Sequence, residues 1–374
     1  MRNPIPNTMS AMLLTGHGGL DKLVYRTDVP VPSPGQGEVL IEVAACGMNN
    51  TDVWVRQGAY GTDEDPKAVA TWRRAAEVST LTFPRIQGTD TAGTIVAVGD
   101  GVSPARIGER AMVDFSIYNT EGDSLADIDY IGHGRDGGYA EYMVVPSENA
   151  HVPDTSLSEV ELATFCCAYL TGEHMLDRAR VAAGERVLVT GASGGVGSGI
   201  LQLCRARGAI PYAVVGAGKE ADALAVGAEA VVTRGKGDLV QEVRKATGGQ
   251  PVDVVADVVA GPLFSDLLRL LRPEGRYTTG GAIGGPVVQL DLRTVYLKHL
   301  EIHGSSQGTR AAFKRIVRYI EQGLIKPLVG GVYKLSDFHR AQTDFMEKRF
   351  FGKLVVVPDS KWSSAKTWSD IQPG

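Results

Sequence analysis

The chain has 374 residues with a formal net charge of −5; 43% of them are hydrophobic and 22% charged, which predicts a soluble globular protein of two domains. The slightly acidic balance argues against a nucleic-acid partner. The sequence has no apolar run of about 18 residues and no apolar segment in its start, MRNPIPNTMSAM, so we expect neither a membrane span nor a secretory signal, and four cysteines without a CxxC pair favour a cytoplasmic protein without disulfides.

The sequence pattern of residues 1–154 predicts a mostly β, barrel-like domain. Short strand-like runs recur there between prolines and glycines. These runs are Ala11–Thr15, Leu23–Thr27, Glu38–Ala44, Thr94–Val98, Arg110–Val113 and Ala140–Val145. Two polar insertions, Gly61–Thr82 and Ser116–Arg135, interrupt the pattern. Each can be a plain surface loop, or a lid or oligomer contact.

The stretch Arg186–Arg207, RVLVTGASGGVGSGILQLCRAR, predicts a strand, a glycine turn and a helix. The first amides of such a helix have no partner within it and its dipole is positive there, so the turn predicts a phosphate site. The dinucleotide fingerprint wants three glycines, and the first is replaced here. A tight turn for backbone reasons alone is the alternative. The expected cofactor contacts in this turn are Ala192, Ser193, Gly194, Gly195, Val196 and Gly197.

Strand-like and helix-like segments alternate after this turn, which predicts βαβ units and a doubly wound parallel sheet. The strands are expected at Tyr212–Val215, Ala230–Thr233, Val252–Val255, Arg276–Thr279 and Leu300–His303. The helices are expected at Ala221–Val226, Leu239–Ala246 and Phe264–Leu271. A cofactor then lies across the carboxyl ends of the strands, at the glycine turn.

The strand that should carry a ribose-binding acid ends at Val215 and is followed by Gly216. No carboxylate stands there, and Lys219 is close in sequence. A missing acid beside a cation favours the 2′-phosphate of NADP(H) over NAD. The alternative is that Lys219 is only a solvated charge at the start of a helix.

The tail leaves the parallel sheet after Ser305. Apolar residues on one stripe predict an amphipathic helix over Arg310–Gln322, followed by a strand, a helix and a strand. These last three segments are Leu328–Leu335, Phe338–Met346 and Lys353–Val357. They are too short to fold alone, so we expect them to return to the first domain, with Trp362 and Trp368 arguing for docking of the end.

Several motifs occur together in one order: PGQGEVLIEVAACGMNNTDVWVRQGAY, FPRIQGTDTAGTIVAVG, GGYAEYMVVP, VLVTGASGGVGSGILQL, TTGGAIGG and FFGKLVVVP. On these motifs the sequence resembles the medium-chain dehydrogenase/reductase superfamily, and is similar to its zinc-free, quinone oxidoreductase-like branch. The resemblance implies an α/β protein with a GroES-like catalytic domain at 1–154, a Rossmann domain at 155–307, and a segment at 308–374 that returns to the catalytic domain.

Zinc-dependent members of this superfamily take a cysteine from a G-x-C-x-[ST]-D motif and a histidine from a G-H-E motif. The matching stretches here are GMNNTD and GTD, which put Asn49 and Thr89 where the ligands would stand. Cys167 resembles the third ligand position. A carboxamide and a hydroxyl are poor zinc ligands, and one thiolate cannot hold the ion, so we predict no metal.

The polar residues of this motif that remain are Asn49, Thr51 and Asp52, and we predict them as the catalytic group. They offer an amide donor, a hydroxyl and a carboxylate. The alternative is that Asn49 and Asp52 only cap or brace a turn.

The resemblance also implies cofactor contacts outside the glycine turn. Thr171 would touch the nicotinamide amide, Gly280 and Gly281 would border the ring, and Lys353 would meet the phosphates. Of these, Lys353 has independent physical sense as a phosphate partner, because a lysine ammonium pairs well with phosphate oxygens.

These observations favour an NADPH-dependent oxidoreductase that transfers hydride to a quinone or a conjugated C=C acceptor, of enone or enal type, without catalytic zinc. The alternatives are an alcohol or aldehyde dehydrogenase of the same superfamily, or a sensor that binds NADPH without catalysis. The residues expected around the nicotinamide favour an enzyme. A sensor could bind NADPH without orienting the nicotinamide ring toward a substrate cleft. The segment Leu300–His303 would end the sheet as an exposed edge, which predicts a homodimer or a dimer-based tetramer.

Overall fold

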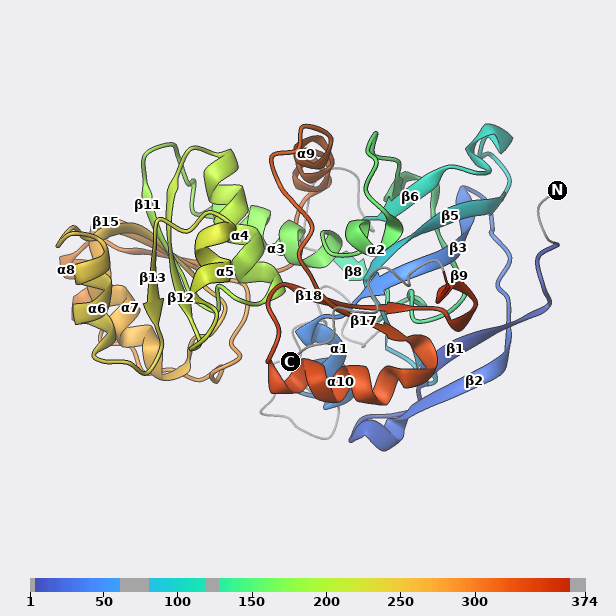
Figure 1. The fold of residues 1–374 in the computed structure, drawn as a ribbon, viewed down its shortest axis with the longest axis horizontal. Coiled ribbons are helices and arrows are strands. Elements are labelled where there is room, and N and C mark those ends of the chain that lie inside the picture. The colour runs from blue at the N-terminus through green and yellow to red at the C-terminus, as the bar shows by residue number, and fades with distance from the viewer. Residues whose placement is uncertain (1–3, 61–80, 119–127, 364–374) are drawn as a thin grey trace. The chain divides into compact units, whose positions relative to one another are not determined.

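The computed structural model describes residues 4–60, 81–118 and 128–363, and the chain divides into two compact units (Figure 1). Unit 1 comprises residues 1–167, 309–311 and 327–374, and unit 2 comprises Ala168–Gly308 and Ala312–Lys326. The predicted insertion Gly61–Thr82 lies almost entirely outside the described residues, as does Trp368. Within the described residues no helix has both the length and the apolar character needed to span a membrane.

Unit 1 is built mainly on antiparallel strands from the N-terminal half of the chain, and two C-terminal strands, β17 and β18, complete its main sheet as a parallel pair. Its main sheet runs in the order β10-β6-β5-β3-β18-β17, with β9 also paired to β3. A second sheet has the order β2-β1-β4, and β7 pairs with β8. The strands are β1 Thr8–Leu14, β2 Leu23–Pro30, β3 Glu38–Gly47, β4 Arg85–Ile86, β5 Asp90–Val98, β6 Arg110–Val113, β7 Ser116–Tyr118, β8 Ile128–Tyr130, β9 Tyr142–Pro146, β10 Ala150–His151, β17 Val329–Lys334 and β18 Lys353–Val357.

The C-terminal segment from residue 327 onward belongs to unit 1. β18 occupies Lys353–Val357, the range predicted for the last strand, and it pairs antiparallel with β3 through Val355 and Val356. The helices of this unit are α1 Asn50–Arg56, α2 Glu159–Leu162 and α10 Phe338–Glu347. Trp362 lies near the Lys334 ammonium, 5.4 Å from the ring centre, so this part of the tail is docked.

Unit 2 is a six-stranded parallel sheet in the order β13-β12-β11-β14-β15-β16. This order is that of a doubly wound dinucleotide-binding sheet, with the switch point between β11 and β14. The strands are β11 Arg186–Val189, β12 Ile210–Val215, β13 Ala230–Thr233, β14 Val252–Asp257, β15 Leu271–Thr279 and β16 Glu301–Gly304. The predicted fold class is therefore confirmed.

Helices cover both faces of this sheet, with α4 and α5 on one face and α6, α7 and α8 on the other (Figure 1). Their bounds are α3 Cys166–Arg178, α4 Gly195–Ala206, α5 Glu220–Ala225, α6 Leu239–Ala246, α7 Phe264–Leu270, α8 Leu292–Leu297 and α9 Arg310–Glu321. On the second face, Val240 and Val243 of α6 and Leu267 of α7 join a core of valines and leucines from the strands. This burial explains why the strands read as continuous apolar runs.

The structure corrects the predicted domain boundaries in two places. The first boundary lies after Cys167 instead of 154, because α2 packs on β3 and β5 of unit 1. Most of α9 belongs to unit 2 instead of the returning segment, because Arg315 forms ion pairs with Glu173 and Asp177 of α3. Glu173 is fully buried, and a buried carboxylate is stable only when it is paired.

Candidate active site

The helix α1 begins at a polar turn that carries the three predicted catalytic residues. Asn49 precedes the helix with an extended backbone. Its backbone amide donates a 2.8 Å hydrogen bond to Oδ2 of Asp52, which lies three residues later in the sequence. This is the acidic half of a capping box, which satisfies an amide that the helix leaves unpaired. The hydroxyl of Tyr139 donates to the same carboxylate oxygen at 2.6 Å.

Asp52 is a bracing residue by these contacts. Only 2% of it is exposed, and burial raises the pKa of its carboxyl to about 6, although the bonds from Tyr139 and Asn49 lower it in part. The geometry therefore favours the turn-bracing interpretation over that of a carboxylate offered to a substrate. Tyr139 was not among the expected site residues, and its place in the motif GGYAEYMVVP gave no direct signal of this contact.

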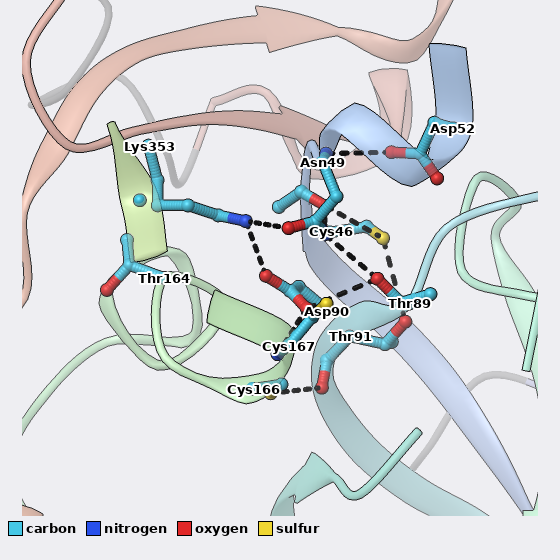
Figure 2. A network of polar contacts seen from close by, with 12 residues as sticks. Cys46, Asn49, Asp52, Thr89, Asp90, Thr91, Thr164, Cys166, Cys167 and Lys353 are labelled. Atoms are coloured by element: carbon cyan, nitrogen blue, oxygen red, sulfur yellow. Dashed lines mark hydrogen bonds and ion pairs between the residues drawn. The ribbon is translucent and has the colours of Figure 1, made fainter. Parts of the chain in front are cut away.

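The side chain of Asn49 points into a buried polar group that we call the Lys353 cluster, formed by Asn49, Thr89, Asp90 and Lys353 (Figure 2). Asn49 Nδ2 donates to Thr89 Oγ1 at 2.9 Å, and Asn49 Oδ1 accepts from the Lys353 ammonium at 2.7 Å. The same ammonium lies 2.6 Å from Asp90 Oδ2. The cluster thus joins α1, the start of β5 and the start of β18.

Lys353, which was expected to meet the cofactor phosphates, contacts two residues of unit 1. Its ammonium contacts Asp90 and Asn49, and 3% of the residue is exposed. The reason is the pairing of β18 with β3, which places the first residue of β18 beside the start of α1. Sequence spacing could not indicate this, because Asn49 and Lys353 are 304 residues apart.

Gly47, at the end of β3, makes room for the cluster. A Cβ at this position would come within 2.3 Å of the carbonyl oxygen of Ala163 and within 3.1 Å of Lys353 Cε and Asp90 Cβ. Only glycine lets the lysine stem and the carboxylate approach the strand this closely. The glycine of the GMNNTD motif therefore has a packing reason.

Thr51, the third predicted catalytic residue, is half-buried and does not join the Lys353 cluster. Its side chain is hydrogen bonded with Tyr60, a partner that the sequence did not suggest. Burial raises the pKa of Tyr60 to about 12, so this phenol is neutral at physiological pH. Tyr60 also packs edge-on against Trp54 of α1, with ring centres 5.4 Å apart.

The two residues that stand at zinc-ligand positions, Asn49 and Thr89, are bonded to each other and to the ammonium of Lys353. Cys167 lies beside them, and its backbone amide donates to Asp90 Oδ1 at 2.6 Å. Among the described residues there is no group of three or more histidine, cysteine, aspartate or glutamate side chains that could hold a metal ion. A cation at this place would compete with an ammonium for the same oxygens.

The glycine turn of unit 2 has the features expected of a phosphate site. Gly194 caps α4 with an extended backbone, so the amides of Gly195, Val196 and Gly197 open the helix. A Cβ on Gly197 would come within 2.3 Å of the carbonyl oxygen of Gly191, which is the close helix-to-strand packing that the fingerprint requires. Ser193 is half-buried, whereas Ala192 is fully buried and donates its amide to Val214.

A second cation lies beside the predicted 2′-phosphate position, and sequence reasoning missed it. Arg234 directly follows β13, and its amide donates to the carbonyl of Val215 at the end of β12. Burial and the nearby Arg234 charge lower the pKa of Lys219. Gly216 has open space where a side chain would project. A sequence signal for Arg234 did exist, because it is the first cation after β13, the strand that pairs with β12.

The residues expected around the nicotinamide ring also come together in unit 2. A Cβ on Gly280 would lie 3.0 Å from Thr171 Cγ2 and 2.8 Å from Met175 Sδ, so the loop after β15 packs directly on α3. Gly281 packs on the loop that follows β14, because its Cβ would lie 3.3 Å from the carbonyl oxygen of Val258. Thr171, Gly280 and Gly281 therefore share one neighbourhood.

Asp257, at the end of β14, fixes the loop beneath these glycines, and the sequence gave no warning of it. The carboxylate is fully buried and accepts from the hydroxyls of Thr190 and Tyr277 and from the amides of Val259 and Ala260. It thus ties the ends of β11, β14 and β15 together. Four donors compensate the buried charge without a cation.

Comparison with known proteins gives a family for this arrangement. Residues 35–154 match the model of the alcohol dehydrogenase GroES-like domain, and residues 195–322 match that of the zinc-binding dehydrogenase. A quinone oxidoreductase from Rattus norvegicus is 30% identical, covering 93% of this chain and 98% of that protein. The chain belongs to the medium-chain dehydrogenase/reductase superfamily. It is an oxidoreductase of this superfamily, whose members bind a nicotinamide cofactor.

Other members of the superfamily carry a different description. An NAD-dependent alcohol dehydrogenase from Sulfurisphaera tokodaii is 29% identical, over 94% of this chain and all of that protein. A solved structure from Sinorhizobium meliloti 1021, given provisionally as an alcohol dehydrogenase, is 75% identical with a TM-score of 0.92, covering 95% of this chain and 98% of that one. The family is thus shown, while quinone and alcohol chemistry are both represented among the relatives.

The buried carboxyl of Asp52 makes a pH-dependent prediction. Its folded pKa of about 6 lies above the ordinary value of 3.8, so the wild-type protein loses stability as the pH rises between these values. Asp52→Asn keeps one oxygen for Asn49 and Tyr139 and removes the charge. We expect the variant to be more stable by roughly 2–3 kcal/mol above this window and little changed below it. Urea unfolding at several pH values measures this; a variant that is less stable at neutral pH contradicts it.

Proposed function

We propose that the protein is an NADPH-dependent reductase of quinones or conjugated enones and enals that works without catalytic zinc. The observation that supports this most directly is the Lys353 cluster, in which the two residues at zinc-ligand positions are bonded to each other and to an internal ammonium. The similarity to quinone oxidoreductases over 98% of their length supports the same assignment.

The chemistry of the acceptor connects this site to this substrate class. Hydride arriving on a saturated aldehyde leaves an alkoxide at the reacting centre, and a metal ion is an efficient way to stabilise it. On a quinone or an enone the charge spreads by conjugation to a distant oxygen, which is far less basic. A hydrogen bond is then sufficient, because one preorganised donor contributes roughly 3–4 kcal/mol to such a transition state.

The fit of the cofactor rests on unit 2. The helix α4 presents its first amides at the glycine turn, and Lys219 and Arg234 lie close enough for the charge of one to act on the other. When bound, the nicotinamide would supply hydride; these amides and cations would hold its phosphates, and the packed loop around Thr171, Gly280 and Gly281 would border its ring.

The alcohol dehydrogenase names among the relatives favour one other function, an alcohol or aldehyde dehydrogenase of the same fold. Oxidation of NADPH with a panel of quinones, enones and matched saturated aldehydes separates the two. No turnover with any acceptor, together with tight NADPH binding, would instead favour a sensor.

The first prediction concerns the cofactor. We expect NADPH to bind at least about tenfold more tightly than NADH, a difference of roughly 1.4 kcal/mol in binding free energy. The reason is that Lys219 and Arg234 would both attract the 2′-phosphate, which only NADPH carries. Lys219→Asp and Arg234→Asp should each shrink this ratio, whereas Lys245→Asp, on the exposed side of α6, should not. Dissociation constants come from quenching of protein fluorescence. Equal affinities of the wild-type protein for the two cofactors would disprove NADPH specificity.

The second prediction concerns metal and acceptor together. The purified protein should carry well under one zinc per chain, and a chelator should leave its NADPH-dependent reduction of a conjugated enone unchanged. That reduction should exceed reduction of the matched saturated aldehyde by orders of magnitude, since only the enone spreads the developing charge. Elemental analysis and initial rates provide the two measurements. Stoichiometric zinc that is lost together with activity would reverse the assignment.

Assembly is the third prediction, and it rests on the free edge of the unit 2 sheet. Within the part of the chain that the structure describes, β16 pairs with β15 alone, and Ile302 on it is 43% exposed. The neighbouring α8 has no buried residue, and Leu292 and Leu297 on it are 67% and 69% exposed. Apolar exposure beside an unpaired strand is typical of a surface that another chain covers.

We therefore expect a homodimer, or a tetramer built from such dimers, at micromolar concentration. Light scattering coupled to size exclusion measures the mass. Ile302→Lys together with Leu297→Lys should dissociate the assembly without unfolding unit 2, because neither side chain is part of its core. A wild-type protein of monomeric mass would rule out this prediction.

A further inference from the structure

We propose that Lys353 is the hydrogen-bond donor to the acceptor oxygen that becomes anionic, and that Asn49, which the sequence suggests for this role, holds the lysine instead. The proposal rests on the proposed reductase function for the identity of the acceptor. The reason is that the other side-chain hydrogen-bond donors of the Lys353 cluster already have acceptors.

Asn49 has no strong donor left for a substrate. Its two Nδ2 hydrogens are directed to Thr89 Oγ1 at 2.9 Å and, more weakly, to the carbonyl oxygen of Gly47 at 3.4 Å. Its Oδ1 accepts from Lys353, so the amide orientation is fixed by a cation on one side and a hydroxyl on the other. Rotating the amide would place its NH₂ against the ammonium.

Thr89 and Asp90 are also satisfied within the cluster. The hydroxyl of Thr89 accepts from Asn49 and donates to Asp90 Oδ1 at 3.3 Å. The same oxygen of Asp90 accepts the amide of Cys167 at 2.6 Å, and its other oxygen pairs with Lys353. Asp90 is fully buried, so its role is internal.

Lys353 is the member of this cluster with a strong donor to spare. An ammonium has three hydrogens, and among the described residues the structure gives it two partners, Asn49 Oδ1 and Asp90 Oδ2. A buried donor without a partner is costly, so a third acceptor is expected for this hydrogen. Asn49 and Lys353 are 8% and 3% exposed, against 1% for Thr89 and 0% for Asp90, so they are the less completely buried members of the cluster.

The chemistry fits an oxygen that gains negative charge. The ammonium is preorganised by two partners and need not reorient when charge develops, which is the condition for strong transition-state stabilisation. Asp90 balances the lysine charge before the reaction, so the buried cation is stable in the resting protein. A charge-assisted hydrogen bond from Lys353 then supplies the donor that a zinc-free site still needs.

A phenolate reports on this contact without turnover, because it resembles the hydroquinone anion. We would titrate para-nitrophenol into the full-length protein with NADP⁺ present, at a pH below the phenol's own pKa, and follow the phenolate absorbance. The variants are Lys353→Met, Lys353→Arg and the double change Asp90→Asn with Lys353→Met. The double variant removes both charges and so avoids an unpaired buried carboxylate. Lys314→Met on the exposed side of α9 is the control.

We expect the wild-type protein and Lys314→Met to bind the phenolate, and Lys353→Arg to retain most of this binding. Loss of the ammonium in the other two variants should weaken it by about tenfold to a hundredfold, the range for a hydrogen bond to a charged group. NADPH affinity should stay within about twofold, and kcat on a quinone should fall more than KM changes.

The proposal is overturned if the folded double variant binds the phenolate as well as the wild-type protein does, or if the wild-type protein binds none. It is also overturned if Lys353→Met weakens NADPH binding and leaves phenolate binding unchanged, because Lys353 is then a phosphate residue. A protein that binds phenolate through Lys353 but reduces no quinone or enone would keep this contact and refute the proposed function instead.

Discussion

The buried ion pair between Lys353 and Asp90 is the interaction on which the rest of unit 1 depends. Moving two charges out of water costs several kcal/mol each, and only close pairing with further hydrogen bonds offsets that cost. The pair meets this condition through Asn49, Thr89 and the amide of Cys167. It also joins the start of the last strand, β18, to the start of β5, so the returning C-terminal segment and the N-terminal sheet form one folded unit. Removing either partner alone would leave an uncompensated charge and cost about 3–5 kcal/mol.

Unit 2 also contains a buried carboxylate, that of Asp257, and stabilises it with neutral hydrogen-bond donors. Asp257 is held by two hydroxyls and two amides, all from strand ends or the loop that it shapes. That loop is hydrogen bonded to the next one, since the amide of Gly284 donates to the carbonyl of Val259 at 2.7 Å. Lys219 and Arg234 lie instead beyond the ends of β12 and β13, where the charge of Arg234 acts on the Lys219 ammonium.

The sequence predicted those parts of the molecule that depend on local patterns. The strands of unit 2 follow from short apolar runs, the glycine turn from its own residues, and β18 from a buried run after a glycine–lysine pair. The side-chain network did not follow, because it depends on pairings between distant strands. Lys353 meets Asn49 across 304 residues, and Arg234 lies beside the end of β12 only because β13 is its sheet neighbour. The lysine of the glycine–lysine pair was therefore assigned to a phosphate, because its carboxylate partner, Asp90, lies far away in the sequence.

The same network links the two residues that the resemblance places at zinc-ligand positions. Asn49 and Thr89 are not independent replacements, because the amide of one bonds the hydroxyl of the other and both contact the ion pair. Restoring a thiolate at Asn49 alone would remove the oxygen that holds Lys353, and would place a second anion beside Asp90 without removing the ammonium. An arriving zinc ion would then meet a positive charge already bonded to the oxygens it needs. Positive charge in the Lys353 cluster is thus carried by a side chain, and a zinc ion bound at these oxygens would have to displace the lysine ammonium.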